Sequence, residues 1–328
     1  MVKFVILTCL LVISMCMLAL YDANHYLSTP IANEDAQYEI EIDRGASLTS
    51  ISQQLHTAGL ISQPRYFQLW ARYKKQSKLL KPGEYVFNAT HTPRQMLDDL
   101  VNGRVKTYQI TIVEGKRLQD FLDVLHSHPK IKHTITAREQ IKTSLNISKP
   151  YLEGLFLPDT YTFTSGVSDL ELLEQSHKLL MQYLQAAWQT RSSALNLSSP
   201  YEALILASIV EKETSMASER ARIAGVFISR LNKGMRLQTD PTVIYGLGNA
   251  FDGNLKREHL RQDNPYNTYV RHGLPPSPIA LVGKAAIDAV MQPTITGDLY
   301  FVAKNDGSHY FSKTYQEHSR AVRKYQLN

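Results

Sequence analysis

The chain has 328 residues, of which 43% are hydrophobic and 20% are charged. This length suffices for two or three domains with cores of their own, and the composition excludes a disordered chain. The net charge of +6 comes without a concentrated block of lysine or arginine, so nucleic acid is not an expected partner. A mildly basic surface suits an anionic polymer or a membrane face equally well.

The chain begins with an apolar segment, Phe4 to Tyr21. About 18 such residues suffice to cross a bilayer. A cleaved signal peptide is the alternative, but no small-residue cleavage site follows and the segment exceeds a usual signal core, so we predict a transmembrane anchor at 1–22. Lys3 precedes the segment and Asp22 follows it, which favours a cytoplasmic N-terminus. A polar, aperiodic linker is predicted at 23–37.

Both cysteines, Cys9 and Cys16, lie inside the apolar segment. The rest of the chain therefore has no thiols. This excludes disulfides, thiolate catalysis and cysteine-based metal sites there. A cysteine-free body is compatible with the periplasm.

Two stretches in the middle of the chain resemble each other. YEIEIDRGASLTSISQQL begins at Tyr38, and YQITIVEGKRLQDFLDVL begins at Tyr108. In each, a short alternating strand precedes a glycine turn and an amphipathic helix. A second similar pair, residues 81–100 and 157–174, extends both copies to the order strand, helix, helix, strand, helix.

We therefore predict two small α+β units, at 38–107 and, with a connecting helix, at 108–190. Aromatic residues alternate in their strands, at Tyr85 in the first and at Tyr161 and Phe163 in the second. Such residues are either core or stacking platforms for sugar rings. The units could thus act as spacers or bind glycan, and the sequence does not decide between these two roles.

A third domain is predicted at 191–328, built around a buried helix that starts after Ser199. Ser199 and Glu202 have the spacing of a capping box, with Pro200 at the first helical position. Residues 203–210 are apolar on nearly every side, which predicts a helix inside a core. The predicted fold class is therefore α+β, with an N-terminal transmembrane helix, two duplicated units and this C-terminal domain.

The buried helix ends in two carboxylates, Glu211 and Glu213. The negative end of the helix dipole raises a carboxyl pKa, as a general acid near neutral pH requires. The two side chains lie about 200° apart, so only one can face a given cleft, and periodicity does not choose between them. The alternative is that both are solvated at a helix end.

Two further carboxylates have supporting roles in this interpretation. Ser218 is predicted to cap a second helix that carries Glu219 in its first turn, where the dipole keeps Glu219 ionised and suits it to electrostatic or structural support. Asp240 and Pro241 are predicted as the N-cap and first residue of a third helix.

Motifs spread over most of the chain carry a family resemblance. They are VEGKRL, EGLFLPDTYTF, ASIVEKET, ASER, FISRL, MRLQTDPTVIYG, PYNTY, GLPPSPIA and LYFVA. Together they resemble the MltG/YceG-like family of membrane-anchored endolytic murein transglycosylases. The resemblance implies that the second glutamate of the E-K-E-T run, Glu213, is the catalytic acid, followed by Thr214 as a substrate contact. Glu211 is then left, like Glu219 and Asp240, for electrostatic or structural support. It also implies that the duplicated units are LysM-like.

The chain departs from the family pattern in one loop. Ser277 replaces the glycine of G-L-P-P-G-P-I, and Leu281, Val282 and Gly283 replace an Asn-Pro-Gly-like segment. These changes concern loop shape and substrate register rather than the reaction class.

A loop rich in proline and glycine carries further candidates for sugar binding. Tyr266, Asn267 and Tyr269 combine aromatic rings with an amide, which suits stacking on pyranose faces and bonding to hydroxyl or N-acetyl groups. The resemblance favours Tyr266, Asn267 and Gln238 as substrate contacts, whereas Tyr269 alone fits a packed turn nearly as well. His309 and His318 lack metal-site spacing, so no metal or cofactor is expected, and His309 is assigned to the side of the cleft.

The resemblance implies a single-pass enzyme of the bacterial inner membrane with a periplasmic catalytic domain. Its expected reaction cleaves the β-1,4 bond between N-acetylmuramic acid and N-acetylglucosamine in nascent strands, forms 1,6-anhydro ends and limits strand elongation. One glutamate suffices for this chemistry, because the N-acetyl group assists. The alternatives are a hydrolytic muramidase that uses Glu219 or Asp240 as second carboxylate, and a non-catalytic peptidoglycan-binding scaffold. Penicillin-binding proteins of the elongation or division machinery are implied partners.

Overall fold

The computed structural model describes residues 2–31 and 36–327 and has the mixed helix and strand content of the α+β class. The chain divides into two compact units: unit 1 comprises residues 1–108 and 162–166, and unit 2 comprises 109–161 and 167–328. The predicted boundary at 190/191 falls inside unit 2. Part of the predicted linker, residues 32–35, lies outside the described residues.

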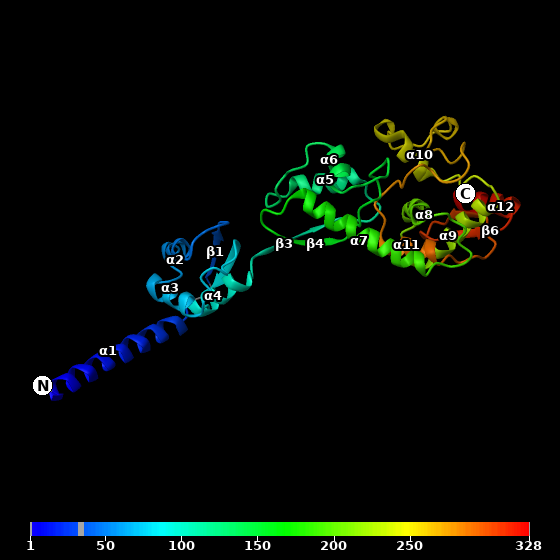
Figure 1. The fold of residues 1–328 in the computed structure, drawn as a ribbon. Helices are drawn as coiled ribbons and strands as arrows, with labels where there is room; N and C mark the ends of the chain where they lie inside the picture. The colour runs from blue at the N-terminus through cyan, green and yellow to red at the C-terminus, as the bar shows by residue number, and fades with distance from the viewer. Residues whose placement is uncertain (1, 32–35, 328) are drawn as a thin grey trace. The chain divides into compact units, whose positions relative to one another are not determined.

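Helix α1, Val2–Ser28, is long and apolar enough to cross a membrane, and the most apolar window along it is 0% buried (Figure 1, dark blue). It continues beyond the predicted end of the anchor at residue 22. The reason is tertiary: Leu27 is buried, and Tyr26 packs against the core of unit 1. The linker predicted from residue 23 is therefore helical in its first part.

Unit 1 is built on a two-stranded antiparallel sheet. Strand β1, Gln37–Ile42, pairs with β2, Gly83–Asn88, so that Ile40 lies opposite Tyr85. The helices are α2, Leu48–Thr57; α3, Pro64–Tyr73; and α4, Pro93–Asn102. The inward faces of the sheet and helices form one apolar core that includes Leu55, Phe67, Tyr85, Phe87 and Met96.

The chain then repeats this order of elements. Strand β3, Thr107–Thr111, pairs with β4, Thr160–Thr164, and the helices are α5, Leu118–Ser127; α6, Arg138–Ser144; and α7, Asp169–Gln189. The alternating aromatics of both copies are core residues, because Tyr85, Tyr161 and Phe163 are 0%, 1% and 5% exposed. These side chains therefore do not offer stacking platforms to a sugar.

The remainder of unit 2 surrounds one buried helix. Helix α8, Pro200–Glu213, packs against α7, α9, α10 and α11 (Figure 1), and every residue from Ala203 to Val210 is buried. Its one polar interruption, Ser208, accepts a hydrogen bond from the backbone N–H of Ile279 at 3.0 Å. The apolar run thus forms the centre of a core, as its sequence predicts.

The other elements follow in order. They are α9, Ala217–Asn232; α10, Asp240–Leu247; the 3-10 turns Gly248–Ala250 and His259–Arg261; α11, Lys284–Met291; β5, Tyr300–Ala303; β6, His309–Ser312; and α12, Tyr315–Gln326. Strands β5 and β6 form an antiparallel hairpin, and α12 packs against both strands.

Helix starts were predicted with mixed success. Ser199 caps α8 by accepting from the N–H of Glu202 at 3.3 Å, which confirms half of the predicted capping box; the Glu202 carboxylate instead accepts the N–H of Ser198 at 2.7 Å. Ser218 does not cap α9, which begins earlier because Thr214 Oγ1 accepts the N–H of Met216 and closes the turn. Asp240 is the first residue of α10 rather than its cap, because its carboxylate is engaged by another partner, described below.

Candidate active site

Unit 2 contains a cavity of about 440 Å³ at the C-terminal end of α8. Helices α9 and α12, the segment before α10 and the β5–β6 hairpin complete its walls. Its lining mixes aromatic rings with polar and charged groups. The polar members include Glu213, Arg230, Gln238, Thr239, Asp240, Tyr269, His309 and His318. Six of these eight residues, all except Arg230 and Thr239, are named individually in the sequence analysis, although they lie far apart along the chain.

Glu213 is the last residue of α8, and its carboxylate accepts a hydrogen bond from the hydroxyl of Thr239. Burial raises the pKa of Glu213 above its ordinary value, and nearby Asp240 raises it further. The Thr239 hydrogen bond acts in the opposite direction because it stabilises the ionised form. Glu213 is therefore a carboxyl group that keeps its proton to higher pH and has a partner ready for its ionised state.

Glu211 points elsewhere. Its carboxylate accepts the backbone N–H of Gly283 at 3.0 Å and lies 3.5 Å from a guanidinium nitrogen of Arg220. Burial also raises the pKa of Glu211, yet this side chain does not line the cavity. The two carboxylates point in different directions from the helix, so that Glu213 faces the cavity and Glu211 does not.

The segment before α10 forms one wall in a constrained conformation. Gln238 has a φ of +50°, which is unusual for a residue with a side chain. Its N–H donates to the carbonyl of Thr268 at 3.1 Å, and the N–H of Thr239 donates to the Thr268 hydroxyl at 3.1 Å. Left-handed backbone outside glycine tends to occur at functional sites, where surrounding contacts hold it.

Asp240 is the second carboxylate of the cavity. The phenol of Tyr269 donates to its Oδ1 at 2.6 Å. Burial raises the pKa of Tyr269, and this hydrogen bond raises it further, so Tyr269 stays a donor at physiological pH. Tyr269 is thus both a lining residue and the partner of Asp240.

Arg230 brings a buried positive charge to the cavity. Its guanidinium donates to the carbonyls of Leu299 at 2.6 Å and Leu237 at 2.7 Å, and it lies 5.1 Å from the Tyr300 ring centroid. Arg230 is 8% exposed, and burial lowers its pKa from the usual range. It therefore ties the segment before α10 to β5 and favours the ionised form of Glu213.

Glu219 supports the opposite wall. Its carboxylate accepts the backbone N–H of His309 at 3.0 Å and contacts His309 Nδ1 at 2.7 Å. The pair joins α9 to the β5–β6 hairpin and orients the imidazole. His309 lines the cavity, which agrees with its predicted position beside the cleft.

Three predicted substrate contacts have other partners. The amide of Asn267, 1% exposed, donates to the carbonyls of His259 and Gln262 and accepts the N–H of Tyr269. The Thr214 hydroxyl accepts a backbone N–H at the end of α8, as described above. Tyr266 lies beside Tyr245, with ring centroids 4.9 Å apart. None of the three is among the residues that line the cavity, so their role as substrate contacts stays a prediction.

One group of side chains has donor atoms suited to a metal. His126, His133 and Asp169 place one ligand atom each within 4.8 Å of the others. Asp169 is fully buried, and its carboxylate already accepts the N–H groups of Thr134 and Ile135 at the start of α7. None of the three lines the cavity with Glu213, so we assign Asp169 to organising its loop.

Comparisons with known proteins agree on one family. The profile of the YceG-like family matches residues 40–324, most of the chain. The chain belongs to the YceG-like family. An endolytic murein transglycosylase of Bacillus subtilis (strain 168) is 32% identical over 307 residues, which cover 87% of this chain and 84% of that protein.

Two further similar proteins extend the comparison. An endolytic murein transglycosylase of Streptococcus pneumoniae serotype 2 is 27% identical, and the match covers 89% of this chain but 59% of that longer protein. A crystal structure of a YceG-like protein from Listeria monocytogenes is similar, with a TM-score of 0.55 and 30% identity. That match covers 88% of this chain and all of the solved one.

Within this YceG-like chain, the loop departure at Ser277 is accommodated. Its hydroxyl lies 2.7 Å from that of Tyr266 and donates to the carbonyl of Pro278 at 2.9 Å, and the residue is fully buried. Sequence reasoning missed Thr239 and Arg230. Arg230 could have been found in the sequence, because it is a charged residue close to the apolar face of α9 formed by Ile223 and Phe227.

Proposed function

We propose that this chain is a membrane-anchored endolytic lytic transglycosylase of peptidoglycan, with Glu213 as both acid and base. The observation that carries the proposal is the environment of Glu213: a carboxyl with a raised pKa, facing a cavity, with a hydroxyl donor on its carboxylate. The names of the relatives from B. subtilis and S. pneumoniae supply the substrate class and reaction.

In the proposed reaction, protonated Glu213 gives its proton to the oxygen that links N-acetylmuramic acid to N-acetylglucosamine. The glycosidic bond breaks, and the N-acetyl carbonyl of the muramic residue stabilises the cation at its anomeric carbon. The ionised Glu213 then takes the proton of the C6 hydroxyl, whose oxygen closes the 1,6-anhydro ring. The Thr239 hydroxyl supports the ionised state between the two transfers.

Around this cavity, Gln238 and Tyr269 are the proposed substrate contacts. Gln238 is exposed at the wall, with an amide able to bond hydroxyl or N-acetyl groups. Aromatic rings from Tyr269 and Tyr300 line the same space and suit pyranose faces. Asp240 and Glu219 are proposed as support, since each is held by a neighbour, Tyr269 and His309 respectively.

A hydrolytic muramidase is the second candidate, because Asp240 lies in the same cavity as Glu213. Two carboxylates are what most hydrolytic glycosidases use. The hydrogen bond that Tyr269 donates to Oδ1 of Asp240 favours the transglycosylase, since it stabilises the ionised carboxylate and so makes it a weaker base for activating water.

The remaining parts of the chain are proposed to place this site. We infer that α1 anchors the chain once in the inner membrane, with Lys3 on the cytoplasmic side and unit 2 in the periplasm. The segments 38–107 and 108–190 are proposed as LysM-like spacers, which the burial of their aromatic residues supports. In this setting the enzyme would limit strand elongation beside penicillin-binding proteins.

The test is mass spectrometry of the products after the full chain, in detergent, digests uncrosslinked peptidoglycan. Fragments with 1,6-anhydro ends are expected, and Glu213→Gln should lower the rate by at least roughly 100-fold. Glu211→Gln is the matched control, a second buried carboxyl on the same helix that faces away from the cavity. Products with reducing ends that disappear in the Asp240→Asn variant would support the muramidase. Binding of peptidoglycan without cleavage would support the non-catalytic scaffold.

A further inference from the structure

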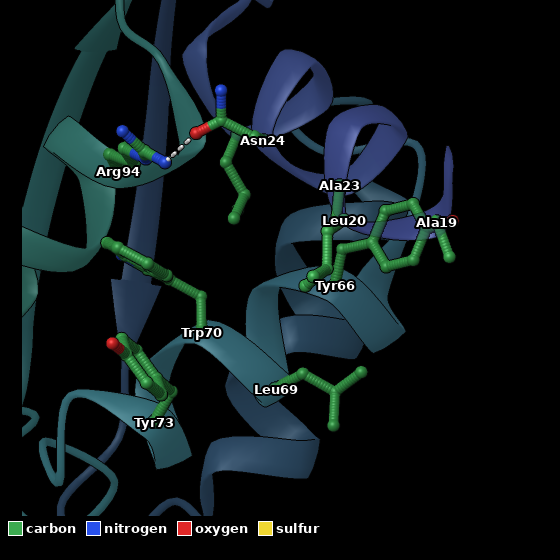
Figure 2. A pocket seen from close by; sticks show the side chains of 10 residues that line it. Ala19, Leu20, Ala23, Asn24, Tyr66, Leu69, Trp70, Tyr73 and Arg94 are labelled. Carbon is green, nitrogen blue, oxygen red and sulfur yellow. Dashed lines mark hydrogen bonds between the residues drawn. The ribbon is translucent and has the colours of Figure 1, made fainter. Parts of the chain in front are cut away.

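Unit 1 contains a second cavity, of about 690 Å³, far from any proposed chemistry in sequence. Figure 2 shows it between the end of α1 and the exposed side of α3, with α4 beside it. Its lining is mostly apolar. The lining residues are Ala19, Leu20, Ala23, Asn24, Leu27, Tyr66, Leu69, Trp70, Tyr73 and Arg94.

The end of α1 is fixed to unit 1 by specific contacts. Arg94 donates to the Asn24 side chain at 2.6 Å (Figure 2), and the Tyr66 phenol donates to Asp22 at 2.8 Å. Leu27 is only 4% exposed. The helix therefore leads directly into unit 1, and the cavity between them is part of the fold of that unit.

The length of the apolar segment sets where this cavity lies relative to the membrane that α1 is proposed to cross. Phe4 to Tyr21 spans about 27 Å as a helix, close to the thickness of the hydrocarbon layer. Ala19 and Leu20 lie in the last turn of that segment and also line the cavity. If α1 crosses a membrane, as proposed above, the cavity opens where hydrocarbon gives way to headgroups.

The exposed side of α3 has the chemistry of that boundary. Leu69 and Tyr73 are 58% and 78% exposed, although the side chain of leucine is apolar and that of tyrosine is largely so. Trp70 stacks on Tyr73, with ring centroids 5.7 Å apart. Tryptophan and tyrosine favour the membrane interface, where one end of the ring is apolar and the other is wet.

Positive charge surrounds this apolar side. Residues 64–81 contain six lysine and arginine residues and no acid. The cationic groups of Arg94 and Lys74 lie 4.5 Å and 5.0 Å from the Trp70 ring. Arg94 has no carboxylate at ion-pair distance within the described part of the chain, and its Nε–H has no hydrogen-bond partner there. Asp22 is the acid at this end of α1, and Tyr66 engages it.

We propose that this cavity binds an anionic phospholipid of the membrane that α1 crosses. An acyl chain packs along Leu20 and Leu69, and the phosphate meets the guanidinium of Arg94 with Lys74 nearby. The charge of the site matches an anionic headgroup, and burying an acyl chain removes the exposed apolar surface of α3 from water. Unit 1 is then held against the membrane surface rather than carried on a free tether. This inference rests on the proposed anchoring by α1.

Trp70 is itself a suitable reporter, because Trp188 is the other of the two tryptophans in the chain. The full chain with Trp188→Phe is reconstituted into vesicles of phosphatidylcholine, with or without phosphatidylglycerol, and brominated acyl chains serve as the quencher. We expect loss of Trp70 fluorescence, greater when the brominated lipid is the anionic one. A Trp70→Phe chain defines the background.

Charge variants test the headgroup contact. Arg94→Gln and Lys74→Gln should remove the preference for brominated phosphatidylglycerol, whereas Arg44→Gln, an exposed arginine of unit 1 outside the cavity, should keep it. Equal quenching by both lipids, or the same preference in Arg94→Gln, would overturn the proposed phosphate contact. Release of quenching by a polyprenyl diphosphate at trace level would assign the cavity to that lipid instead.

The same vesicles separate this inference from the anchoring. Extraction of the protein by alkaline carbonate would contradict a membrane-spanning α1 and remove the basis of the lipid site with it. Resistance to extraction with Trp70 unquenched would leave the anchor in place and overturn only the lipid site.

Discussion

The hydroxyl of Thr239 donates to the carboxylate of Glu213, and this contact joins two segments that are 26 residues apart in sequence. Thr239 is 3% exposed, and its own N–H is held by Thr268. The donor is therefore fixed before any substrate arrives. A fixed donor stabilises negative charge without reorganisation, which suits a carboxyl that must lose and regain a proton in one cycle.

Thr239→Val should raise the pKa of Glu213 further, because the hydrogen bond that favours its ionised form is lost. The high-pH limb of kcat/KM, where the acid loses its proton, should then move to higher pH, while the second transfer weakens and kcat falls by about 10-fold. The pH dependence of cleavage of soluble glycan strands measures both effects. Thr239→Ser keeps the hydroxyl and should restore the wild-type profile. An unchanged limb in the valine variant would contradict the role of this contact.

Glu213→Gln should stabilise the fold at neutral pH. The folded-state pKa of Glu213 lies above its ordinary value near 4.5, so the folded chain binds the proton more tightly than the unfolded chain. Its contribution to stability is therefore complete below about pH 4.5 and is lost as pH rises through the folded-state pKa. The Tm difference between variant and wild type should grow from pH 4 to pH 8. A constant difference would mean that burial does not disfavour the ionised form.

Arg230→Lys should destabilise unit 2 despite keeping the charge. The guanidinium bonds the carbonyls of Leu237 and Leu299 at once, a geometry that an ammonium group does not reproduce. Leaving one buried carbonyl unpaired costs about 2 kcal/mol of unfolding free energy. Urea denaturation provides the measurement, and Arg236→Lys, at an exposed neighbour, is the matched control. Equal stability of the two variants would argue against a bridging role.

Asn267→Ala and Gln238→Ala should separate loop structure from substrate contact. Asn267 is buried with its amide bonded to three backbone groups, so its loss should lower the unfolding free energy by about 1–3 kcal/mol. Gln238 is exposed at the cavity, so its loss should raise KM with little effect on Tm. The reverse pattern would indicate that Asn267 contacts the substrate and that Gln238 supports the fold.

The sequence by itself determined the features that depend on local pattern. The apolar periods, caps and glycine turns predicted α1, the repeated order of elements and a buried helix ending in two glutamates, because these signals act within one or two turns of chain. It also indicated both candidate carboxylates and, through resemblance, the family. Boundaries were less secure, as at Ser218 and Asp240, where side chains from outside the helix decided the first residue.

The tertiary structure alone decided which groups meet. Glu211 and Glu213 differ by two positions on one helix, and only packing of α8 against its neighbours directs one of them into the cavity. Thr239 and Arg230 gain their roles from contacts with distant residues, which leave no periodic trace in sequence. From sequence, Tyr85 and Tyr161 could be either core residues or stacking platforms for sugar rings, and their burial shows that they are core residues. Side-chain partnership and burial depend on the whole fold, whereas helix and strand propensity depends on neighbours in the chain.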